Sequence, residues 1–424
     1  MKRDFDVLVV GGGMVGAACA ALLGAYDPTS SLRVAMLEPR PVPFPPAGEP
    51  LDLRVSALSR ASQRLCERTG AWQRIVERGA AAYQRMVVWE EGGSPGGPGS
   101  IRFDAADLGE PDLGHIVENR SVQAALTERA VAHGVTLMRT GVASLQPGDE
   151  AMTVVTSDDR RLSAALVVAA DGGDSAIRRL AGIDTRGWDY GQHAVVAHLV
   201  AERSHEATAW QRFLATGPLA LLPLADGRVS LVWSTTPERA AELVALDDDA
   251  FGAEVTGASA GVLGSLRPAT RRASFPLRLL HAVSYTQPRL ALVGDAAHGV
   301  HPLAGQGVNL GLMDCAALAE VIGEALGQGA DPGDRGALRR YERWRKAENV
   351  PAMALMDGLK RLFSNDDPVL AWARRTGLGL VDRAAPLKRG LIERAMGLAG
   401  EVPLPVSDLA RGLSPQGTVP SRGG

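Results

Sequence analysis

The first hydrophobic run of the chain, residues 6–10 (DVLVV), is short and rich in β-branched residues. Glycines follow it, and apolar residues then recur at helical spacing as far as residue 26. A second apolar run at 33–37 ends in Glu38. This order predicts a strand, a turn, a helix and a second strand. Because a helix connects the two strands, they must be parallel, and the chain therefore begins as a doubly wound α/β domain.

The middle of the chain mixes helical and strand-like patterns. Residues 55–72 carry one periodic apolar face, which predicts a helix. Apolar runs at 86–89 and 101–103 flank a Gly/Pro-rich stretch and predict a β-hairpin with a surface tip. A helix at 121–132 and a fully buried strand at 164–170 then return the chain to the α/β domain.

The pattern changes between about residues 185 and 285. Several strand-like runs and an Asp-Gly hairpin signal at 226–227 predict an antiparallel sheet inserted in the α/β domain. A buried strand at 289–293 and a helix at about 308–326 follow, and the chain beyond Pro351 is helical in outline. The predicted organisation is an α/β domain (1–79, 101–184 and 286–350), an inserted sheet (80–100 and 185–285), a helical region (351–410) and a flexible tail (411–424).

Composition excludes several classes of protein. The chain of 424 residues is 46% hydrophobic, which is enough for a sizeable core. It has 45 basic and 48 acidic residues and a net charge of −3, so we expect no nucleic-acid partner. The three cysteines lie far apart without CxxC or histidine spacing. This spacing argues against disulfides and metal sites and favours a reducing cytosol.

An uncharged stretch at 7–26 resembles a signal peptide or a membrane span only superficially. Asp4 and Asp6 stand where a signal peptide carries basic residues, and the glycines at 11–13 would break an apolar helix of either kind. We therefore expect a cytoplasmic protein.

Gly11, Gly13 and Gly16 form a GxGxxG pattern between the first predicted strand and the first helix, and Glu38 ends the next strand. This placement is typical of a dinucleotide site. The first glycine allows a tight turn, the second lets a pyrophosphate approach backbone N–H groups, and the third allows close packing of helix on strand. Glu38 would accept hydrogen bonds from ribose hydroxyls, and a carboxylate there suits NAD or FAD but opposes NADP. A glycine-rich turn without a ligand is the alternative.

A distant segment distinguishes between NAD and FAD. Residues 291–298 (ALVGDAAH) and 301–311 (HPLAGQGVNLG) resemble the FAD-dependent aromatic hydroxylases of the single-component type. The resemblance implies that Asp295 holds the ribityl chain and that the loop at 302–309 lies along the flavin ring. A glycine-rich loop that opens a helix also directs N–H groups at the flavin N1/C2=O edge, where negative charge collects on reduction.

Further matches extend from near residue 6 to near residue 397 and narrow the resemblance to the hydroxylases of ubiquinone biosynthesis. They include residues 171–178 (DGGDSAIR), 52–58 (DLRVSAL), 115–119 (HIVEN), and Gln211 with Phe213. The resemblance implies that Arg54 lies at the flavin side of the cleft, with a salt bridge to Glu38 as the alternative. Motif and resemblance together predict these cofactor-binding residues: Gly11, Gly13, Met14, Val15, Gly16, Glu38, Arg54, Asn119, Asp171, Asp295, Pro302, Gly305, Gly307, Val308 and Asn309.

The resemblance implies a FAD-binding, Rossmann-like domain of the glutathione-reductase type with an inserted antiparallel substrate sheet and C-terminal helices. It also implies an enzyme that uses NADH or NADPH and O2 to hydroxylate the ring of a polyprenylated phenol through a flavin C4a-hydroperoxide. No residue is identified as a catalytic acid or base. The alternatives are a flavin hydroxylase of a different aromatic substrate, a halogenase or reductase on the same scaffold, an NAD-dependent dehydrogenase, and a non-catalytic FAD-binding scaffold of a quinone-biosynthesis complex.

A prenylated substrate implies an apolar entrance framed by the inserted sheet and the C-terminal helices. It also implies peripheral contact with the inner face of the membrane, or a ubiquinone-biosynthesis protein complex that presents the lipid. Residues 351–400 mix large apolar residues with Lys and Arg, which suits such a docking surface. A packed helical cap with a solvated basic face would show the same composition.

Overall fold

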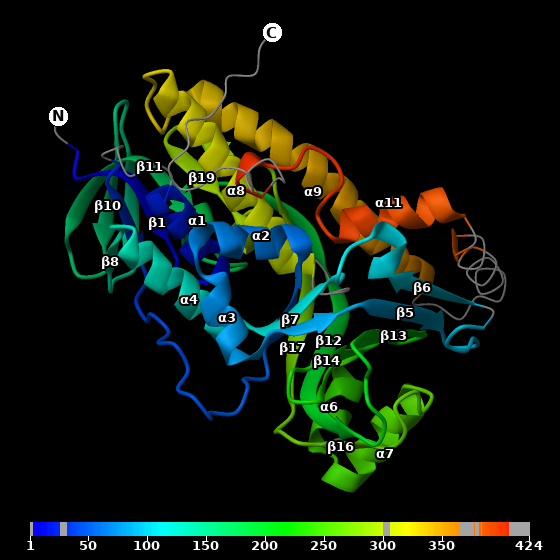
Figure 1. The fold of residues 1–424 in the computed structure, drawn as a ribbon. Coiled ribbons are helices and arrows are strands. Elements are labelled where there is room, and N and C mark those ends of the chain that lie inside the picture. The colour runs from blue at the N-terminus through cyan, green and yellow to red at the C-terminus, as the bar shows by residue number, and fades with distance from the viewer. Residues whose placement is uncertain are drawn as a thin grey trace.

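Two large sheets and the helices around them form the protein, as the computed structural model shows (Figure 1). The structure describes residues 3–25, 32–97, 99–299, 306–363, 377, 381–382 and 384–406. The predicted tail at 411–424 lies outside the described residues, as does part of the predicted helical region at 351–410.

An eight-stranded sheet builds the α/β half of the protein. Its core is parallel in the order β19, β11, β1, β2, β8, and antiparallel β18, β10 and β9 extend it. The buried runs predicted at 6–10, 33–37, 164–170 and 289–293 are confirmed as its central strands. The strands are β1 (Phe5–Val10), β2 (Val34–Leu37), β8 (Thr136–Met138), β9 (Val142–Pro147), β10 (Met152–Thr156), β11 (Arg161–Ala169), β18 (Thr286–Gln287) and β19 (Leu290–Leu292).

Helices pack on this sheet and on one another. The first helix, α1 (Met14–Ala25), contacts both α4 (Asn119–Ala132) and α8 (Gln306–Gly327), and α8 contacts α9 (Arg335–Phe363). The helices predicted at 121–132 and 308–326 are thus confirmed. The remaining helices of this half are α2 (Arg60–Thr69), α3 (Trp72–Gly79) and α5 (Ala176–Leu180), and α11 (Ala385–Ala395) lies in the C-terminal region.

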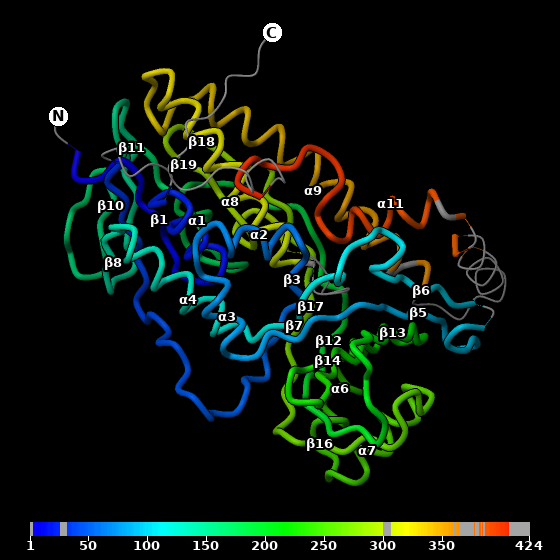
Figure 2. Tube along the Cα trace, in the orientation of Figure 1, coloured from blue at the N-terminus to red at the C-terminus, as the bar shows by residue number. Residues whose placement is uncertain are grey.

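A nine-stranded sheet forms the other half. Its order is β20, β17, β12, β15, β14, β13, β5, β6, with β16 beside β12, and every pair is antiparallel except β13 with β5. Figure 2 shows β5 and β6, from the first quarter of the chain, beside β13. The strands are β5 (Arg85–Glu90), β6 (Ser100–Asp104), β12 (Thr185–Ala201), β13 (Thr208–Leu214), β14 (Gly217–Pro223), β15 (Val229–Thr235), β16 (Leu266–Pro268), β17 (Ala273–Ala282) and β20 (His298–Gly299).

A small third sheet corrects the prediction for residues 55–72. Residues Val55–Ser59 form strand β3, which pairs with β7 (Gly114–Glu118), and β4 (Ala81–Tyr83) pairs with the other edge of β7. The predicted helix begins only at Arg60, because the Ser59 hydroxyl accepts a hydrogen bond from Ser62 N and caps α2 there.

Two helices also correct the prediction of an all-strand insert. These are α6 (Pro237–Ala245), capped by Thr236, and α7 (Asp248–Ala258), capped by Asp247. Both pack on the face of the nine-stranded sheet that carries Leu219, Leu231 and Trp233. The opposite face packs on the small sheet through Ala57 and Ile116.

The C-terminal helix α9 continues through Pro351 without ending there. Its last turn contacts the nine-stranded sheet, where Phe363 stacks on Phe213 with ring centroids 4.2 Å apart. No helix within the described part of the chain is both long and apolar enough to cross a membrane.

Candidate active site

The glycine loop after β1 contains two glycines that packing requires and one that faces open space. Gly11 has φ +98°, and a Cβ there would lie 2.4 Å from Ala170 O. A Cβ on Gly16 would lie 1.9 Å from Gly11 O. A Cβ on Gly13 would meet no atom within 4 Å. Backbone N–H groups at Gly13 and at the start of α1 are therefore accessible to a ligand.

Glu38, at the end of β2, lies directly beside this loop. Its Oε2 accepts a hydrogen bond from Gly12 N at 2.8 Å, and its Oε1 accepts one from Arg40 N at 2.9 Å. The half-buried carboxylate is thus held at the position that the motif predicts, next to the backbone that a dinucleotide would approach.

Met14 and Val15 are the first two residues of α1, and the side chain of Val15 lies against Gly294 and Gly311. A Cβ on Gly294 or on Gly311 would approach the Val15 side chain to 3.0 or 2.8 Å. The close approach brings the first turn of α1 and the start of α8 together, although 296 positions separate Val15 from Gly311. Both segments that the sequence predicts to bind cofactor therefore form one site.

Asp295 follows β19 and its side chain is exposed to solvent. The surrounding protein nevertheless removes enough water to raise the pKa of its carboxyl, and the nearby His298 and Arg54 oppose that rise. Asp295 and the Arg54 guanidinium thus share one electrostatic environment, although Arg54 comes from the other side of the site.

The first turn of α8 contributes Gly307, Val308 and Asn309, and the backbone N–H groups at the start of a helix point toward its N-terminal end. The Asn309 side chain is buried and ties this turn to β3 and α2. Its Nδ2 donates to Ala57 O at 2.8 Å, and its Oδ1 accepts from Ser59 N at 3.0 Å. The amide of Asn309 therefore positions the first turn of α8 against β3. Of the predicted site residues, Pro302 and Gly305 lie outside those described.

Residues 171–178 (DGGDSAIR) are hydrogen-bonded to the loop that carries Asp295. The Asp171 carboxylate accepts hydrogen bonds from Ser175 Oγ at 2.5 Å and Ile177 N at 3.0 Å, which caps α5. Arg178 donates to Gly173 O at 2.7 Å and to Ala296 O at 2.8 Å. The buried guanidinium thereby joins this segment to the loop that carries Asp295.

Asp314 is the fully buried anchor of that loop. Its Oδ2 accepts from Gly294 N at 3.0 Å and lies 2.5 Å from His298 Nε2. Its Oδ1 accepts from Arg345 Nε at 2.8 Å and from Asn349 Nδ2 at 3.0 Å. Burial opposes the charge, but His298 and Arg345 outweigh burial and lower the pKa of Asp314 to about 2. His298 is therefore a hydrogen-bonding residue of this network.

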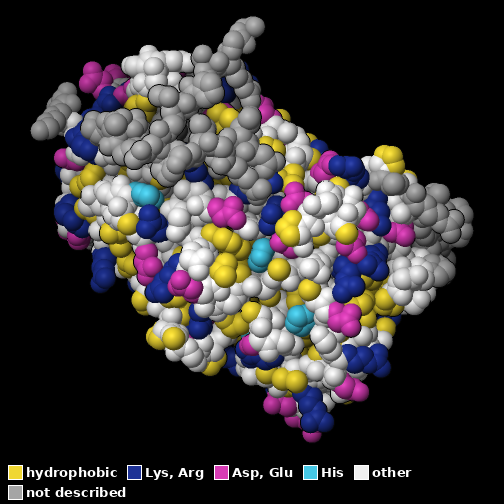
Figure 3. All heavy atoms as spheres, viewed as in Figure 1, with side chains coloured by type: hydrophobic (Ala, Val, Ile, Leu, Met, Phe, Trp, Pro, Cys, Tyr) yellow, Lys and Arg dark blue, Asp and Glu magenta, His cyan; other side chains and the backbone are white. Residues whose placement is uncertain are grey.

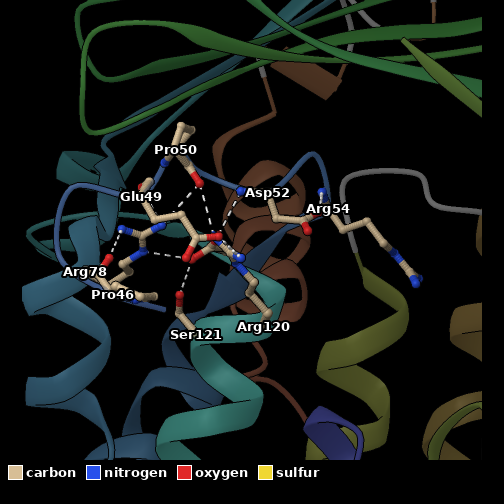
Figure 4. Close-up of polar contacts among 9 residues, drawn as sticks. Pro46, Glu49, Pro50, Asp52, Arg54, Arg78, Arg120 and Ser121 are labelled. Atoms are coloured by element: carbon tan, nitrogen blue, oxygen red, sulfur yellow. Dashed lines mark hydrogen bonds and ion pairs between the residues drawn. The ribbon is translucent and has the colours of Figure 1, made fainter. Parts of the chain in front are cut away.

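A second buried carboxylate, Glu118, anchors the segment before Arg54 (Figure 4). Its Oε1 accepts from Asp52 N at 2.7 Å and from Arg120 Nε at 2.6 Å, and its Oε2 accepts from Arg78 Nε at 3.0 Å and from Ser121 Oγ. Despite its burial, these hydrogen bonds lower the pKa of Glu118 to about 2. Arg78 also donates to Glu49 O and to the carbonyls of the two prolines at 46 and 50.

Arg54 itself is held by its backbone while its side chain stays free. Asn119 N donates to Arg54 O at 3.0 Å, and Arg54 N donates to Asp52 Oδ1 at 3.0 Å. The exposed guanidinium points away from the Glu118 cluster in Figure 4 and has no hydrogen bond or ion pair with any described residue. The alternative salt bridge with Glu38 is thus absent from the described contacts. The Asn119 side chain is half-buried and accepts a hydrogen bond from Ser56 Oγ at 2.8 Å.

Comparison with known proteins identifies the family. The family model described as FAD binding domain matches residues 4–354. Ubiquinone hydroxylase UbiL of Rhodospirillum rubrum is 40% identical, over 92% of this chain and 89% of that protein. The 3-demethoxyubiquinol 3-hydroxylase of Escherichia coli is 37% identical, over 94% and 100%. The chain belongs to the ubiquinone-biosynthesis hydroxylases. It is an FAD-dependent monooxygenase.

Solved structures of flavin monooxygenases have the same fold as this hydroxylase. The p-nitrophenol 4-monooxygenase PnpA of Pseudomonas putida superposes with a TM-score of 0.73 at 18% identity, covering 94% of this chain and 100% of that one. PqsL of Pseudomonas aeruginosa, solved with 2-aminobenzoylacetate, gives 0.69 at 25% identity, covering 88% and 99%. The predicted FAD-binding fold with an inserted antiparallel sheet is confirmed.

The residues of the site fit FAD. The open side of Gly13 lies at a helix N-terminus and beside Glu38, which suits the pyrophosphate and ribose. An unpaired guanidinium at Arg54 suits an anionic group, and the N-terminal end of α8 suits the electron-rich edge of the flavin. The cluster around Glu118 escaped prediction because its partners come from three separate segments. A glutamate before the first residue of a helix was the one local signal.

Asp314→Asn is expected to lower the free energy of unfolding by about 3 to 5 kcal/mol at pH 7, because it leaves the buried Arg345 without its charge partner. In the folded wild-type protein the pKa of the Asp314 carboxyl, about 2, lies below the ordinary 3.8. The stabilisation is therefore present above about pH 4 and lost as the pH falls toward 2. Urea titrations of both proteins between pH 7 and pH 2.5 measure the difference and its decline.

The matched control is Asp189→Asn, which removes an aspartate that also pairs with an arginine, Arg278, but on the surface. We expect this control to change stability by less than about 1 kcal/mol. Equal effects of the two substitutions would contradict the anchoring role of Asp314.

Proposed function

We propose that this hydroxylase acts on the aromatic ring of a polyprenylated phenol, a precursor of ubiquinone, with O2 as oxidant and NADH or NADPH as reductant. The observation that carries the proposal is the position of the flavin elements. The first turn of α8 contacts strand β3 through the hydrogen bond from Asn309 to Ala57 O. Strand β3 in turn packs on an apolar face of the nine-stranded sheet. The named activities of the relatives from R. rubrum and E. coli support the substrate class.

The residues assigned to FAD divide into three groups. Gly11, Gly13 and Gly16, with Met14 and Val15, would hold the pyrophosphate against the first turn of α1. Glu38 would bind the ribose. Bound FAD supplies the activation and transfer of oxygen to the substrate ring.

The other assigned residues lie on the flavin side of the site. Asp295 would bind the ribityl hydroxyls. The first turn of α8 would donate N–H groups to the flavin, and Arg54 would neutralise negative charge there. Asn119 and Asp171 hold the backbone around these groups through the hydrogen bonds described above.

The substrate side is assigned to the inserted sheet, in the residue ranges 80–100 and 185–285. An apolar cluster joins this sheet to the C-terminal helix: Val88, Ile101 and Phe213 pack with Phe363 and residues around it. Such a wall excludes water and would accept a prenyl tail, which prefers apolar surroundings. The flavin side is assigned to the ranges 1–79, 101–184 and 286–350.

The lipid reaches this wall, in our proposal, through peripheral contact of the C-terminal helices with the inner face of the membrane or through a ubiquinone-biosynthesis complex. Val350, Leu355 and Leu359 on α9 and Leu387 on α11 are large apolar side chains that are exposed. On the face seen in Figure 3, basic and acidic side chains are interspersed. Contact through apolar side chains therefore suits this surface better than attraction of anionic lipid alone.

Purified protein is expected to be yellow and to incorporate one atom of 18O from 18O2 into a prenylphenol when NADH or NADPH is supplied. Mass spectrometry of the product measures the incorporation. A protein that retains FAD but incorporates no oxygen into any prenylphenol would instead favour the scaffold alternative.

Asp295→Ala is expected to reduce FAD retention, because the exposed carboxylate is the group assigned to the ribityl hydroxyls. The ratio of flavin to protein absorbance after gel filtration reports the change. Wild-type flavin occupancy in this variant would contradict the assigned role.

Glu118→Gln is expected to weaken FAD binding by acting through Arg54. Loss of the carboxylate charge loosens the contacts with Arg78 and Arg120 and so the segment that carries Arg54. Titration of apoprotein with FAD should show a loss of about tenfold for Arg54→Ala, a smaller loss for Glu118→Gln, and no further loss when both are combined. Additive losses would mean that Glu118 does not act through Arg54.

A further inference from the structure

Gln211, on strand β13, is a buried polar residue without a protein partner. It is 5% exposed, and its amide makes no hydrogen bond with any residue that the structure describes. The nitrogen and oxygen of this amide are not fully shielded from solvent. The amide therefore retains a small accessible surface, as a group at the edge of an internal space would.

Strand register places Gln211 on the face of the sheet that looks toward the flavin half. Gln211 lies opposite Ala220 on β14 and opposite Val88 on β5. Ala209, two residues earlier, packs with Ala57 and Ile116 of the small sheet. Because side chains alternate along a strand, Gln211 projects from the same face as Ala209.

The residues opposite Gln211 on the two neighbouring strands, Ala220 and Val88, are apolar, so they offer its amide no hydrogen-bond partner. An unpaired amide in such a position costs stability, and a retained cost calls for a physical explanation. Phe213, the next residue on this face, belongs to the apolar wall that ends at Phe363. The amide thus lies beside the surface that would accept the prenyl tail.

Three other polar residues on this face, Gln192, His198 and Ser230, are paired or shielded from solvent. Gln192 donates from its Nε2 to Thr216 O at 2.5 Å. His198 and Ser230 lie opposite each other on β12 and β15, and their ring nitrogens and hydroxyl are unpartnered but fully shielded. A ligand cannot reach those shielded groups without a movement of the sheet, whereas the amide of Gln211 needs none.

We propose that Gln211 is the residue that recognises the phenol hydroxyl of the substrate. This inference rests on the proposed function and deepens it. An amide both donates and accepts hydrogen bonds, so it can bind the hydroxyl in its protonated or its ionised form. The hydroxyl would complete the pairing of the amide, while the prenyl tail packs along the wall around Phe213. Gln211 thereby sets the orientation and the specificity of the ring rather than moving a proton.

The test measures how well the oxidised, FAD-loaded enzyme distinguishes 2-geranylphenol from geranylbenzene, which lacks the hydroxyl. Perturbation of flavin absorbance reports the binding of each ligand. We expect wild type to bind the phenol about five- to tenfold more tightly. Gln211→Met, which keeps the length of the side chain without its amide, should bind the two ligands equally.

Stability and FAD content separate this role from a structural one. Because the amide has no protein partner, Gln211→Met should leave the Tm of ligand-free enzyme unchanged or higher, with wild-type FAD content. The control is Gln287→Met, which removes a half-buried amide that donates to Ala181 O at 2.9 Å. The control should lower the Tm and keep the wild-type preference for the phenol.

Three results would overturn the assignment. If Gln211→Met keeps the wild-type preference for the phenol, Gln211 does not recognise the hydroxyl, and the proposed function stands without it. If the variant loses FAD, its role lies in cofactor binding. If wild-type, FAD-loaded enzyme binds neither ligand, the proposed function fails together with this inference.

Discussion

The fully buried carboxylate of Asp314 holds together the part of the protein on which the site depends. It connects the loop after β19, through Gly294 N and His298, to α8, where Asp314 itself lies, and to Arg345 and Asn349 on α9. Burial of a charge is costly, so this arrangement is stable only while all its hydrogen bonds are made. The loop is consequently restricted to one geometry, and the start of α8 is held beside Val15.

Glu118 applies the same principle on the other side of the site. Both carboxylates are buried, both have a pKa lowered to about 2, and both accept a backbone N–H from a segment that connects two strands. In each case the adjacent charged residue, Arg54 or Asp295, is left exposed. A rigid backbone with an unpaired side chain is the arrangement that a preorganised binding site requires. The entropy of ordering the site is then lost on folding and not when the ligand binds.

The sequence predicted those parts of the fold that depend on local patterns. The strand, glycine loop and helix at the N-terminus followed from apolar runs and glycines, and the position of Glu38 at the end of the second strand followed from the same pattern. Strand β3 did not, because its conformation comes from pairing with β7, about 60 residues away. The amide of Asn309 likewise bonds Ser59 N across 250 residues, a contact that no local pattern encodes. Helices α6 and α7 did carry local signals, the caps Thr236 and Asp247, in a region whose strand-like runs concealed them.

The distribution of paired and unpaired polar groups separates structure from function in this protein. Asp314, Glu118 and Arg178 are buried and fully engaged, so their contribution is to stability and geometry. Arg54 and Gln211 lack partners among the described residues; the first is charged and exposed, whereas the second is neutral, buried and paired across its strand with apolar residues. An anionic cofactor group suits the first environment, whereas a neutral phenol attached to a hydrocarbon tail suits the second, since the desolvation cost of a hydroxyl is small compared with that of a charge. In our proposal, the environment of Arg54 therefore suits the flavin and that of Gln211 suits the substrate ring.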